Sequence, residues 1–356
     1  MKSRLLNNKN HFTVIDLFCG AGGFSEGFRQ AGYSIVSGID NNNFALETFS
    51  RNFTVTIAIN EDLSSSINGS LNYYSLPKKV DVIIGGPPCQ GFSIAGKRIS
   101  DDPRNKLYRV YIDLIEKFDP SAVVMENVPA ILSLFGGEIA KQIKEDFEDL
   151  GFKTQVFTLL ASDYGVPQNR KRTFFVGVKS NKLFKIPAPT TPFTPITTEM
   201  AISDLPLLED SQGAAEMEYI VAPQNDYQRQ IRENSAILFN HWAVIHQSKT
   251  VEIIKLVPDG GNYKDLPENL QDTRKVNIAW TRMNSKRPCF TIDAGHNHHF
   301  HYSANRVPTV RECARIQSFP DKFRFWGIKT SQFRQVGNAV PPLLAKEIAL
   351  ELKKIL

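Results

Sequence analysis

The sequence predicts an α/β protein built on a doubly wound parallel sheet, and two observations lead to this prediction. Over the first 180 residues, short apolar runs alternate with amphipathic stretches, which is the pattern of repeated strand and helix units. Glycine-rich segments follow the first and the third of these runs, as expected where a strand turns toward a helix. Hydrophobic residues make up 42% of the 356 residues and charged residues 22%, which excludes disordered, collagen-like and disulfide-scaffold proteins.

Each predicted strand is a short apolar run, and each predicted helix has apolar residues at helical spacing. The strands are expected at residues 14–18, 33–39, 80–84, 122–125, 156–160 and 173–178. The helices are expected at residues 24–30, 107–118, 138–149 and 342–356. Between residues 186 and 198, four prolines among five threonines forbid a regular helix and predict an extended linker. Residues 199–304 have weak periodicity, so we expect a smaller, irregular domain there.

A glycine-rich turn follows the first predicted strand. Gly20, Gly22 and Gly23 lie between this strand and a helix, and Asp40 follows the second strand, 20 residues after Gly20. Such a turn lets a ligand approach the backbone, and a carboxylate at this spacing accepts hydrogen bonds from ribose hydroxyls. The pattern Gly-x-Gly-Gly favours a nucleoside such as S-adenosylmethionine over a dinucleotide. The alternative is a tight turn that only packs the helix against the sheet.

A rigid loop that contains Cys89 follows the third predicted strand. Pro87 and Pro88 fix the backbone before the thiol, and glycines on both sides allow a ligand to come close. A thiol at the carboxyl edge of a parallel sheet lies where such folds bind ligands, so we predict that Cys89 is a nucleophile. The other cysteines are expected to be small buried hydrophobic residues: Cys19, Cys289 and Cys313. The polar stretch after Cys89 is expected to be a lid over an anionic substrate, through Lys97, Arg98 and Arg104.

Acidic and basic side chains are expected at the same edge of the sheet. The fourth predicted strand delivers Glu126 to this edge, where a carboxyl group can bind or protonate a ring nitrogen; the alternative is a solvated surface residue. Gln168, Arg170 and Arg172 lie just before the last strand, and alternate residues of an extended segment face the same way. They are expected to hold a phosphate or polarise a carbonyl oxygen, unless they form only a solvated edge.

Membrane, secreted and metal-binding classes are not indicated. No apolar run approaches the roughly 18 residues of a membrane helix, and the N-terminus lacks a signal-peptide apolar segment, so we expect a cytoplasmic protein. The four cysteines are widely spaced without a CxxC pair, which indicates reduced thiols. Surface or phosphate contacts are favoured over a metal site for the clustered histidines, so no metal is expected at His296, His298, His299 and His301.

Eight segments of the sequence, taken in order, carry a resemblance to a known family. They are Asp16–Phe24, Asp40, Asp62–Leu63, Gly86–Ser93, Glu126–Val128, Gln168–Arg172, Arg311–Pro320 and Gln335–Pro342. Together they resemble the cytosine-5 DNA methyltransferase family of bacterial restriction-modification systems. The resemblance implies a Rossmann-like, S-adenosylmethionine-dependent catalytic domain at residues 1–185 and 320–356. It also implies a target-recognition domain with its return segment at residues 186–319.

The resemblance implies roles for individual residues. The residues expected around S-adenosylmethionine are Phe18, Gly20, Gly23, Asp40, Asp62, Pro88, Leu107, Asn338 and Val340. Among them, Asp40 would bind the ribose and Asp62 the adenine amino group. Cys89 would attack C6 of a cytosine that has flipped out of the duplex, while Glu126 holds the ring N3 and the exocyclic amine. Arg170 would assist at the carbonyl side of the base, with support from Arg172 and Gln168.

The implied activity is methylation of cytosine C5 in a specific double-stranded DNA sequence, by a monomer that works alone or beside a restriction endonuclease. A tRNA cytosine methyltransferase is the nearest alternative, because that branch shares the catalytic segments and a Cys-Phe-Thr like that at Cys289–Thr291. However, Gly91–Ser93 matches the DNA enzymes. A nicotinamide dehydrogenase would share Asp40 but leaves the Pro-Pro-Cys loop unexplained. Intact Cys89 and Glu126 argue against an inactive DNA-binding regulator.

The net charge of +5 permits a polyanionic partner, and its distribution indicates where that partner would bind. Residues 181–305 hold 12 Lys and Arg against 14 Asp and Glu, so the small domain as a whole is not basic. Within residues 270–311, a basic cluster outnumbers Asp272 and Asp293; it comprises Arg274, Lys275, Arg282, Lys286, Arg287, Arg306 and Arg311. We expect this cluster and the lid to line a DNA cleft, which would make binding sensitive to salt.

Overall fold

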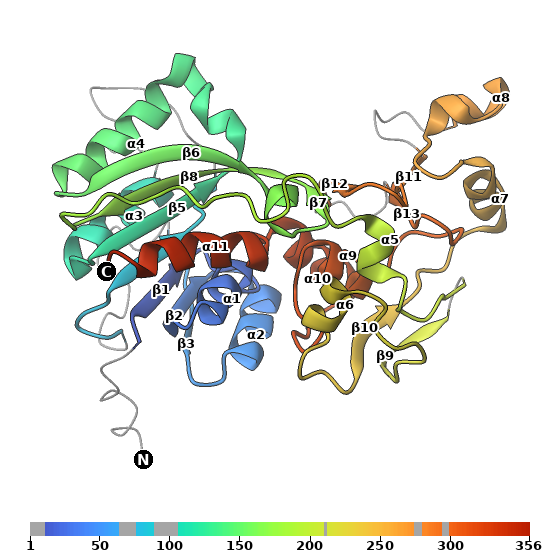
Figure 1. The fold of residues 1–356 in the computed structure, drawn as a ribbon, viewed down its shortest axis with the longest axis horizontal. Coiled ribbons are helices and arrows are strands. Elements are labelled where there is room, and N and C mark those ends of the chain that lie inside the picture. The colour runs from blue at the N-terminus through green and yellow to red at the C-terminus, as the bar shows by residue number, and fades with distance from the viewer. Residues whose placement is uncertain (1–10, 64–75, 89–105, 210–211, 274–279, 294–298) are drawn as a thin grey trace. The chain divides into compact units, whose positions relative to one another are not determined.

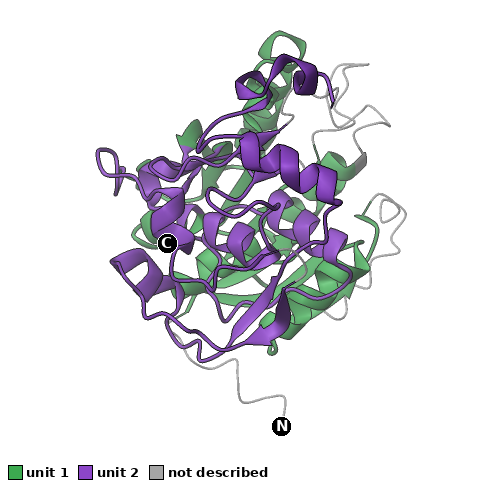
Figure 2. Cartoon of the chain, turned by 90° about the vertical axis from the view of Figure 1, so that its right-hand side faces the viewer, with its two compact units in different colours: residues 1–159, 171–188, 345–356 green, residues 160–170, 189–344 purple. Residues whose placement is uncertain are grey.

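The structure is a computed structural model that describes residues 11–63, 76–88, 106–209, 212–273, 280–293 and 299–356. It divides into two compact units, which Figure 2 shows in different colours. Unit 1 comprises residues 1–159, 171–188 and 345–356, and unit 2 comprises residues 160–170 and 189–344. The division after residue 188 lies in the segment rich in proline and threonine. The return to unit 1 comes at residue 345, which is later than the expected residue 320.

A seven-stranded sheet forms the centre of unit 1, in the order β3-β2-β1-β4-β5-β8-β6 (Figure 1). Its strands are β1 (Thr13–Leu17), β2 (Ser34–Asp40), β3 (Ile57–Asn60), β4 (Val82–Gly85), β5 (Ala122–Asn127), β6 (Lys153–Leu160) and β8 (Lys171–Val178). The pairs from β3 to β5 are parallel, whereas β8 runs antiparallel to β5. The predicted doubly wound α/β fold is confirmed, and β8 is its antiparallel exception.

Helices cover both faces of this sheet. They are α1 (Gly23–Gln30), α2 (Asn43–Asn52), α3 (Lys106–Phe118), α4 (Glu138–Asp149) and most of α11 (Pro342–Lys353), with 3₁₀ turns η5 (Pro129–Leu132) and η6 (Leu134–Gly137). On one face, α3 and α4 bury Tyr111 and Phe147 in a core that includes Ile83 of β4. From the other side, α1 and α2 pack against β1, β2 and β3 (Figure 1). Lys353 of α11 donates to the carbonyl of Ala31, so the C-terminal helix is fastened beside α1.

The sequence did not predict α2 and β3, which complete this half of the sheet. Helix α2 begins after Asn42, whose side chain accepts a hydrogen bond from the backbone N of Ala45 (3.0 Å). Phe49 of α2 packs so closely on β2 that a Cβ at Gly38 would overlap its ring. The absence of a side chain at Gly38 therefore allows α2 to pack closely on β2. Because short helices depend mainly on such tertiary packing, their own periodicity is a weak signal.

Unit 2 consists of short helices and short strands. They are η7 (Ala161–Tyr164), β7 (Gln168–Asn169), α5 (Thr198–Ile202), β9 (Gly213–Met217), α6 (Asp226–Ile231), β10 (Leu238–Trp242), α7 (Ser248–Leu256), η8 (Tyr263–Asp265), α8 (Glu268–Gln271), β11 (Thr281–Arg282), β12 (Cys289–Phe290), β13 (His299–Phe300), α9 (Val310–Ile316) and α10 (Lys329–Asn338). Strand β9 pairs antiparallel with β10, while β11 pairs parallel with β13 and β12 with β7. Elements this short account for the weak periodicity of residues 199–304.

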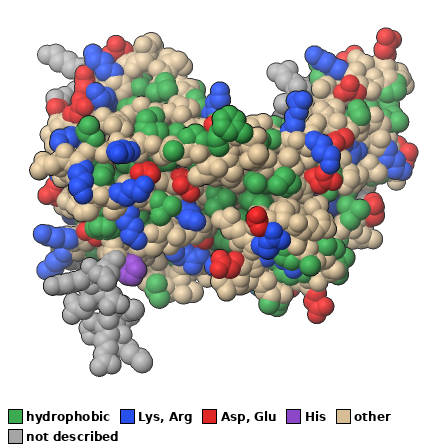
Figure 3. Space-filling model, in the orientation of Figure 1, with side chains coloured by type: hydrophobic (Ala, Val, Ile, Leu, Met, Phe, Trp, Pro, Cys, Tyr) green, Lys and Arg blue, Asp and Glu red, His purple; other side chains and the backbone are tan. Residues whose placement is uncertain are grey.

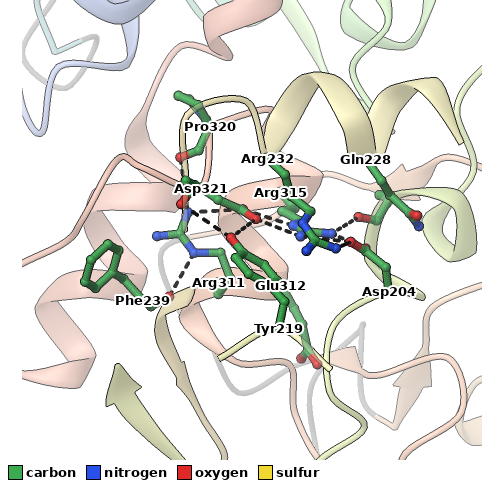
Figure 4. A network of polar contacts seen from close by, with 12 residues as sticks. Asp204, Tyr219, Gln228, Arg232, Phe239, Arg311, Glu312, Arg315, Pro320 and Asp321 are labelled. Atoms are coloured by element: carbon green, nitrogen blue, oxygen red, sulfur yellow. Dashed lines mark hydrogen bonds and ion pairs between the residues drawn. The ribbon is translucent and has the colours of Figure 1, made fainter. Parts of the chain in front are cut away.

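A buried network of charged side chains connects α9 to the earlier part of unit 2 (Figure 4). Arg315 of α9 pairs with Asp204 and, at 2.7 Å, with Asp321, and all three side chains are completely buried. Arg232, which follows α6, reaches Asp204 at 3.0 Å. Arg311 donates to the backbone carbonyl of Phe239 in β10 (2.9 Å). These bonds make α9 and the segment after it part of unit 2, which explains why the return to unit 1 comes after residue 320.

His301 is buried beside α9 as a neutral imidazole. Its Nδ1 accepts hydrogen bonds from the backbone N–H groups of Ser303 (3.1 Å) and Ala304 (3.0 Å), and its Nε2 faces Glu312 at 3.6 Å. Burial lowers the pKa of His301 from 6.5 to about 4; the negative charge of Glu312 opposes this shift, and the positive charge of Arg306 adds to it. Protonation would cost the acceptor role of Nδ1, so the fold favours the neutral ring.

We expect unit 2 to lose stability as the pH falls from about 6.5 to about 4. In this window the unfolded chain binds a proton at His301 that the folded chain does not, so protons favour unfolding. The loss is at most about 1.4 kcal/mol per pH unit for one histidine. The three tryptophans of the chain all belong to unit 2; they are Trp242, Trp280 and Trp326. Their fluorescence during urea denaturation therefore measures the stability of this unit.

His301→Asn provides the control for this pH effect. An asparagine Oδ1 can accept the same two N–H bonds but does not titrate, so the variant should show a flatter dependence of stability on pH between 6.5 and 4. A variant with the same slope as the unchanged chain would contradict the assignment to His301.

Candidate active site

Neighbouring strands bring the predicted site segments to one edge of the sheet in unit 1. Leu17 of β1 lies beside Gly85 of β4, and Gly85 lies beside Met125 of β5. The turn after β1, the loop after β4 and Glu126 therefore share the carboxyl edge, where sheets of this kind bind ligands. Strand β8 enters in the opposite direction, with Phe174 beside Glu126, so its first residues reach the same edge.

The turn after β1 leaves open space beside Asp40. Phe18 and Gly20 have positive φ angles of 60° and 52°, and a Cβ at Gly20 would meet no atom within 4 Å. One carboxylate oxygen of Asp40 accepts a hydrogen bond from the backbone N of Gly20, and the other accepts one from Asn42, both at 2.8 Å. The backbone thus fixes this carboxylate next to an accessible glycine. The arrangement fits the ribose of a nucleoside cofactor.

Asp16 is a second carboxyl group close to the turn, inside β1. It is 1% exposed and accepts a hydrogen bond from the hydroxyl of Ser25 (2.6 Å). Burial raises the pKa of Asp16 to about 7; the Ser25 hydroxyl opposes the rise and the charge of Asp40 adds to it. Burial also raises the pKa of Asp40, against the stabilising N–H bonds. A positive ligand at this turn would favour the ionised form of both groups.

Glu126 and Arg172 form an ion pair at the carboxyl edge. Nε of Arg172 lies 2.6 Å from Oε1 of Glu126, and each side chain is 13% exposed. Glu126 is the last residue but one of β5 and Arg172 is the second residue of β8, so the antiparallel register of these strands brings them together. A charge-assisted contact of this kind fixes the direction of the carboxylate. The pair joins two of the side chains that the sequence predicted for the site.

The loop after β4 runs beside Glu126. A Cβ at Gly86 would lie 3.0 Å from Oε2 of Glu126, which favours a glycine there. Asn127 donates from Nδ2 to the carbonyl of Pro87 (2.9 Å), while its Oδ1 accepts from the backbone N of Val128 (2.9 Å). No role was predicted for Asn127 from the sequence, although its place directly after Glu126 was the available signal. Several predicted residues lie outside the described ones: Cys89, Lys97, Arg98 and Arg104.

Gln168 and Arg170 belong to unit 2 and are buried. Arg170 donates to the backbone carbonyls of Ile292 (3.1 Å) and Gly337 (2.8 Å). Gln168 donates to the side chain of Gln317 and accepts a bond from the backbone N of Ile292 (3.1 Å). These bonds direct two nitrogens of the Arg170 guanidinium to backbone carbonyls, and the expected contact of Arg170 with the carbonyl side of a base stays a prediction.

The remaining residues expected around the cofactor have varied surroundings. Gly23 is buried at the start of α1, and Leu107 packs on the core from the first turn of α3. Asp62, after β3, is exposed, and so is Pro88 in the loop after β4. Asn338 and Val340 belong to unit 2. Asn338 is exposed at the end of α10, and Val340 is buried two residues later.

The prediction of a basic surface cluster at residues 270–311 is wrong for three of its members. Arg282, Arg306 and Arg311 are at most 4% exposed, so they cannot line a DNA cleft. Arg306 donates two hydrogen bonds of 2.8 Å to Glu312, which lies one residue beyond the range 270–311. The exposed members among the described residues are Lys286 and Arg287. On the face drawn in Figure 3, basic and acidic side chains are interspersed.

The cysteines outside the predicted catalytic loop are free and buried, as expected for Cys19, Cys289 and Cys313. Burial raises the pKa of all three thiols, which disfavours the reactive thiolate.

Among the residues that the structure describes, no group of three or more His, Cys, Asp or Glu side chains is arranged to hold a metal ion. No helix in the same part of the chain is long and apolar enough to cross a membrane.

Known proteins match the chain over nearly its whole length. The model of the C-5 cytosine-specific DNA methylase family matches residues 12–354. Type II methyltransferase M.DdeI of Desulfomicrobium norvegicum is 39% identical, over 94% of this chain and 87% of the relative. Type II methyltransferase M1.HphI of Haemophilus parahaemolyticus is 38% identical, over 96% and 87%. A crystal structure of a DNA modification methyltransferase from an E. coli prophage matches with a TM-score of 0.79 and 27% identity, over 97% and 99%. The predicted resemblance is confirmed, and the tRNA alternative is not favoured.

Proposed function

The chain belongs to the C-5 cytosine-specific DNA methylase family, and from that premise we propose how its residues carry out the reaction. As a member of this family it is a methyltransferase that modifies C5 of cytosine in DNA, of the restriction-modification kind. We propose that it acts as a monomer on one specific sequence of double-stranded DNA and that the target cytosine flips out of the base stack. We also propose that it is accompanied by a restriction endonuclease that recognises the same DNA sequence.

We propose that S-adenosylmethionine binds at the turn after β1. This group supplies an electrophilic methyl carbon on a positively charged sulfur. Asp40 is held by two backbone N–H groups beside the open space at Gly20, so its free lone pairs can accept the ribose hydroxyls. The buried carboxyl group of Asp16 favours a cationic ligand nearby. The remaining proposed contacts follow the resemblance: Phe18, Gly23, Asp62, Pro88, Leu107, Asn338 and Val340.

Asp40→Asn should weaken the binding of S-adenosylmethionine by about tenfold to a hundredfold, because the amide keeps one acceptor and loses the charge. Isothermal titration of the purified protein measures this dissociation constant. Asp119→Asn is the matched control, because Asp119 also lies in unit 1 but its side chain is 76% exposed and forms a surface ion pair with Lys179. Equal affinity in the two variants would remove Asp40 from the cofactor site.

The proposed reaction starts from a cysteine nucleophile. The Cys89 thiolate adds to C6 of the flipped cytosine, so an S–C6 bond forms and electron density moves to N3 and C5. Glu126, oriented by Arg172, holds N3 and the exocyclic amine and offsets the charge that develops there. C5 then takes the methyl group, with S-adenosylhomocysteine as the product. Loss of the C5 proton to a base and cleavage of the S–C6 bond restore the aromatic ring as 5-methylcytosine.

Glu126→Gln should lower the rate of methyl transfer by about a hundredfold, because the amide cannot serve as the acid or the carboxylate at N3. Single-turnover transfer of a labelled methyl group measures the rate, while cofactor affinity should stay within about twofold. Glu145→Gln, at an exposed residue of α4 whose carboxylate lies 3.9 Å from Nζ of Lys141, provides the control. A Glu126→Gln enzyme with unchanged single-turnover rate would refute the assigned role.

The single observation that supports this proposal best is the oriented Glu126 and Arg172 pair beside the loop after β4. The direct test incubates the purified protein with methyl-labelled S-adenosylmethionine and DNA of mixed sequence, followed by digestion to nucleosides. The expected label is in 5-methylcytosine, and bisulfite sequencing of DNA from an expressing host then reads the target sequence. Absence of label from DNA contradicts the proposal, whereas label in tRNA alone would support the alternative.

A further inference from the structure

Asn338 is exposed at the end of α10, between two backbone carbonyls that other side chains bind. The last carbonyls of a helix have no partner within the helix and need one from elsewhere. Gly337, just before Asn338, is buried, and Ala339, just after it, leaves the helix with φ −68° and ψ 147°. The backbone conformation at Asn338 therefore depends on the groups that bind the carbonyls of Gly337 and Ala339.

Arg170 binds the first of these carbonyls. Its guanidinium donates to the carbonyl of Gly337 at 2.8 Å and to that of Ile292 at 3.1 Å, and the residue is 2% exposed. A cation at the C-terminus of a helix interacts favourably with the helix dipole. Because the guanidinium is planar and rigid, it fixes both carbonyls at once. Arg170 therefore joins the end of α10 to the segment that follows β12.

Gln317 binds the second carbonyl. Its Nε2 donates to the carbonyl of Ala339 at 2.6 Å, and its Oε1 accepts a bond from Gln168. Gln168 in turn accepts a bond from the backbone N of Ile292 at 3.1 Å. Gln168 and Gln317 are both completely buried, so water competes little with the hydrogen bonds that their side chains make. Both routes thus begin at Ile292 and end on the two sides of Asn338.

We propose that Arg170 and Gln317 are positioning residues that hold Asn338 in the conformation in which it binds S-adenosylmethionine. The inference rests on the proposed function, which includes Asn338 among the cofactor contacts. Both side chains act through the backbone on either side of Asn338. When one of the hydrogen bonds to the carbonyls of Gly337 and Ala339 is lost, the end of α10 can relax. Cofactor affinity then falls although no direct contact to the cofactor is deleted.

The test is a double-mutant cycle on cofactor binding, measured by isothermal titration without DNA. Gln317→Glu keeps the acceptor for Gln168 but turns an oxygen toward the carbonyl of Ala339, and we expect it to raise the dissociation constant about tenfold. In the Asn338→Ala background the same change should have no further effect. Gln228→Glu is the matched control, because Gln228 is also completely buried, accepts from the backbone N of Gln224 and donates to the carbonyl of Met200.

The outcomes separate a positioning role from general destabilisation. Gln228→Glu should lower the melting temperature as much as Gln317→Glu does, yet leave cofactor affinity unchanged. If the Gln317→Glu variant does not fold, the Gln317→Met variant takes its place in the cycle. Methionine removes the hydrogen bonds to Ala339 and Gln168 without adding a charge. Equal affinities for the Gln317 and Gln228 variants, or an undiminished Gln317 effect in the Asn338→Ala background, would overturn the inference. Methylation of DNA by the unaltered enzyme tests the proposed function separately.

Discussion

Cys89→Ser is expected to lower methyl transfer by about a thousandfold or more while S-adenosylmethionine binds as before. A thiol has a pKa of about 8.5, so a favourable local field gives a useful population of thiolate near neutral pH. A serine hydroxyl does not ionise there, and without addition at C6 the C5 carbon is too weak a nucleophile to accept a methyl group. The cofactor contacts proposed for Asp40 and Gly20 do not involve the thiol, so binding and transfer should separate.

Two measurements decide this prediction. Isothermal titration gives the cofactor dissociation constant, and single-turnover transfer to DNA gives the rate. DNA with 5-fluorocytosine adds a direct readout, because C5 then cannot lose a proton and the S–C6 bond persists on a denaturing gel. Cys313→Ala is the control; its thiol is buried in α9 and free, so the variant should still transfer methyl groups. A Cys89→Ser protein that turns over normally, or still forms the adduct, would remove Cys89 from the mechanism.

The sequence predicted the site best where a residue follows directly from the end of a strand. Asp40 is the last residue of β2, and Glu126 is the last but one of β5, so recognising the strands was sufficient to place both carboxylates at one edge. The parallel register of β1, β4 and β5 then aligns the loops. Such inferences succeed because strand order and strand direction follow from the alternation of apolar runs and helices.

The sequence could not show which arginine faces Glu126. Gln168, Arg170 and Arg172 were expected to share one face, yet Arg172 meets Glu126 through the antiparallel pairing of β8 with β5, whereas Arg170 binds carbonyls of residues 292 and 337. These partners lie more than 120 residues away in the chain, and no local pattern encodes them. Tertiary contacts of this kind decide whether a charged side chain binds substrate or backbone.

Charge counting failed in unit 2 for a related reason. Arg282 donates to several backbone carbonyls, including those of Ile254 (2.6 Å) and Val257 (2.7 Å), and is almost completely buried. A buried arginine that satisfies carbonyls has the same sequence signal as an exposed one that binds phosphate. A window of residues therefore overestimates the basic surface wherever a domain of short elements uses arginine to tie its connections together.

Asp204→Asn is expected to destabilise unit 2 by about 3–5 kcal/mol, because it breaks a buried ion pair and leaves positive charge uncompensated. Asp204 and Arg315 are completely buried, and Asp204 also accepts a bond from Arg232 at 3.0 Å (Figure 4). When an amide replaces the Asp204 carboxylate, the carboxylate of Asp321 still pairs with Arg311 and Arg315. Urea denaturation followed by tryptophan fluorescence measures the change, since all three tryptophans lie in unit 2.

Asp226→Asn makes the same chemical change at a surface pair and serves as the control. Asp226 pairs with Arg229 in α6, but the two side chains are 98% and 57% exposed, so water screens the attraction and the loss should stay below about 1 kcal/mol. The difference between the two variants therefore isolates burial. Equal shifts of the denaturation midpoint would mean that the Arg315 network contributes no more than a surface contact, and that other packing holds α9 in unit 2.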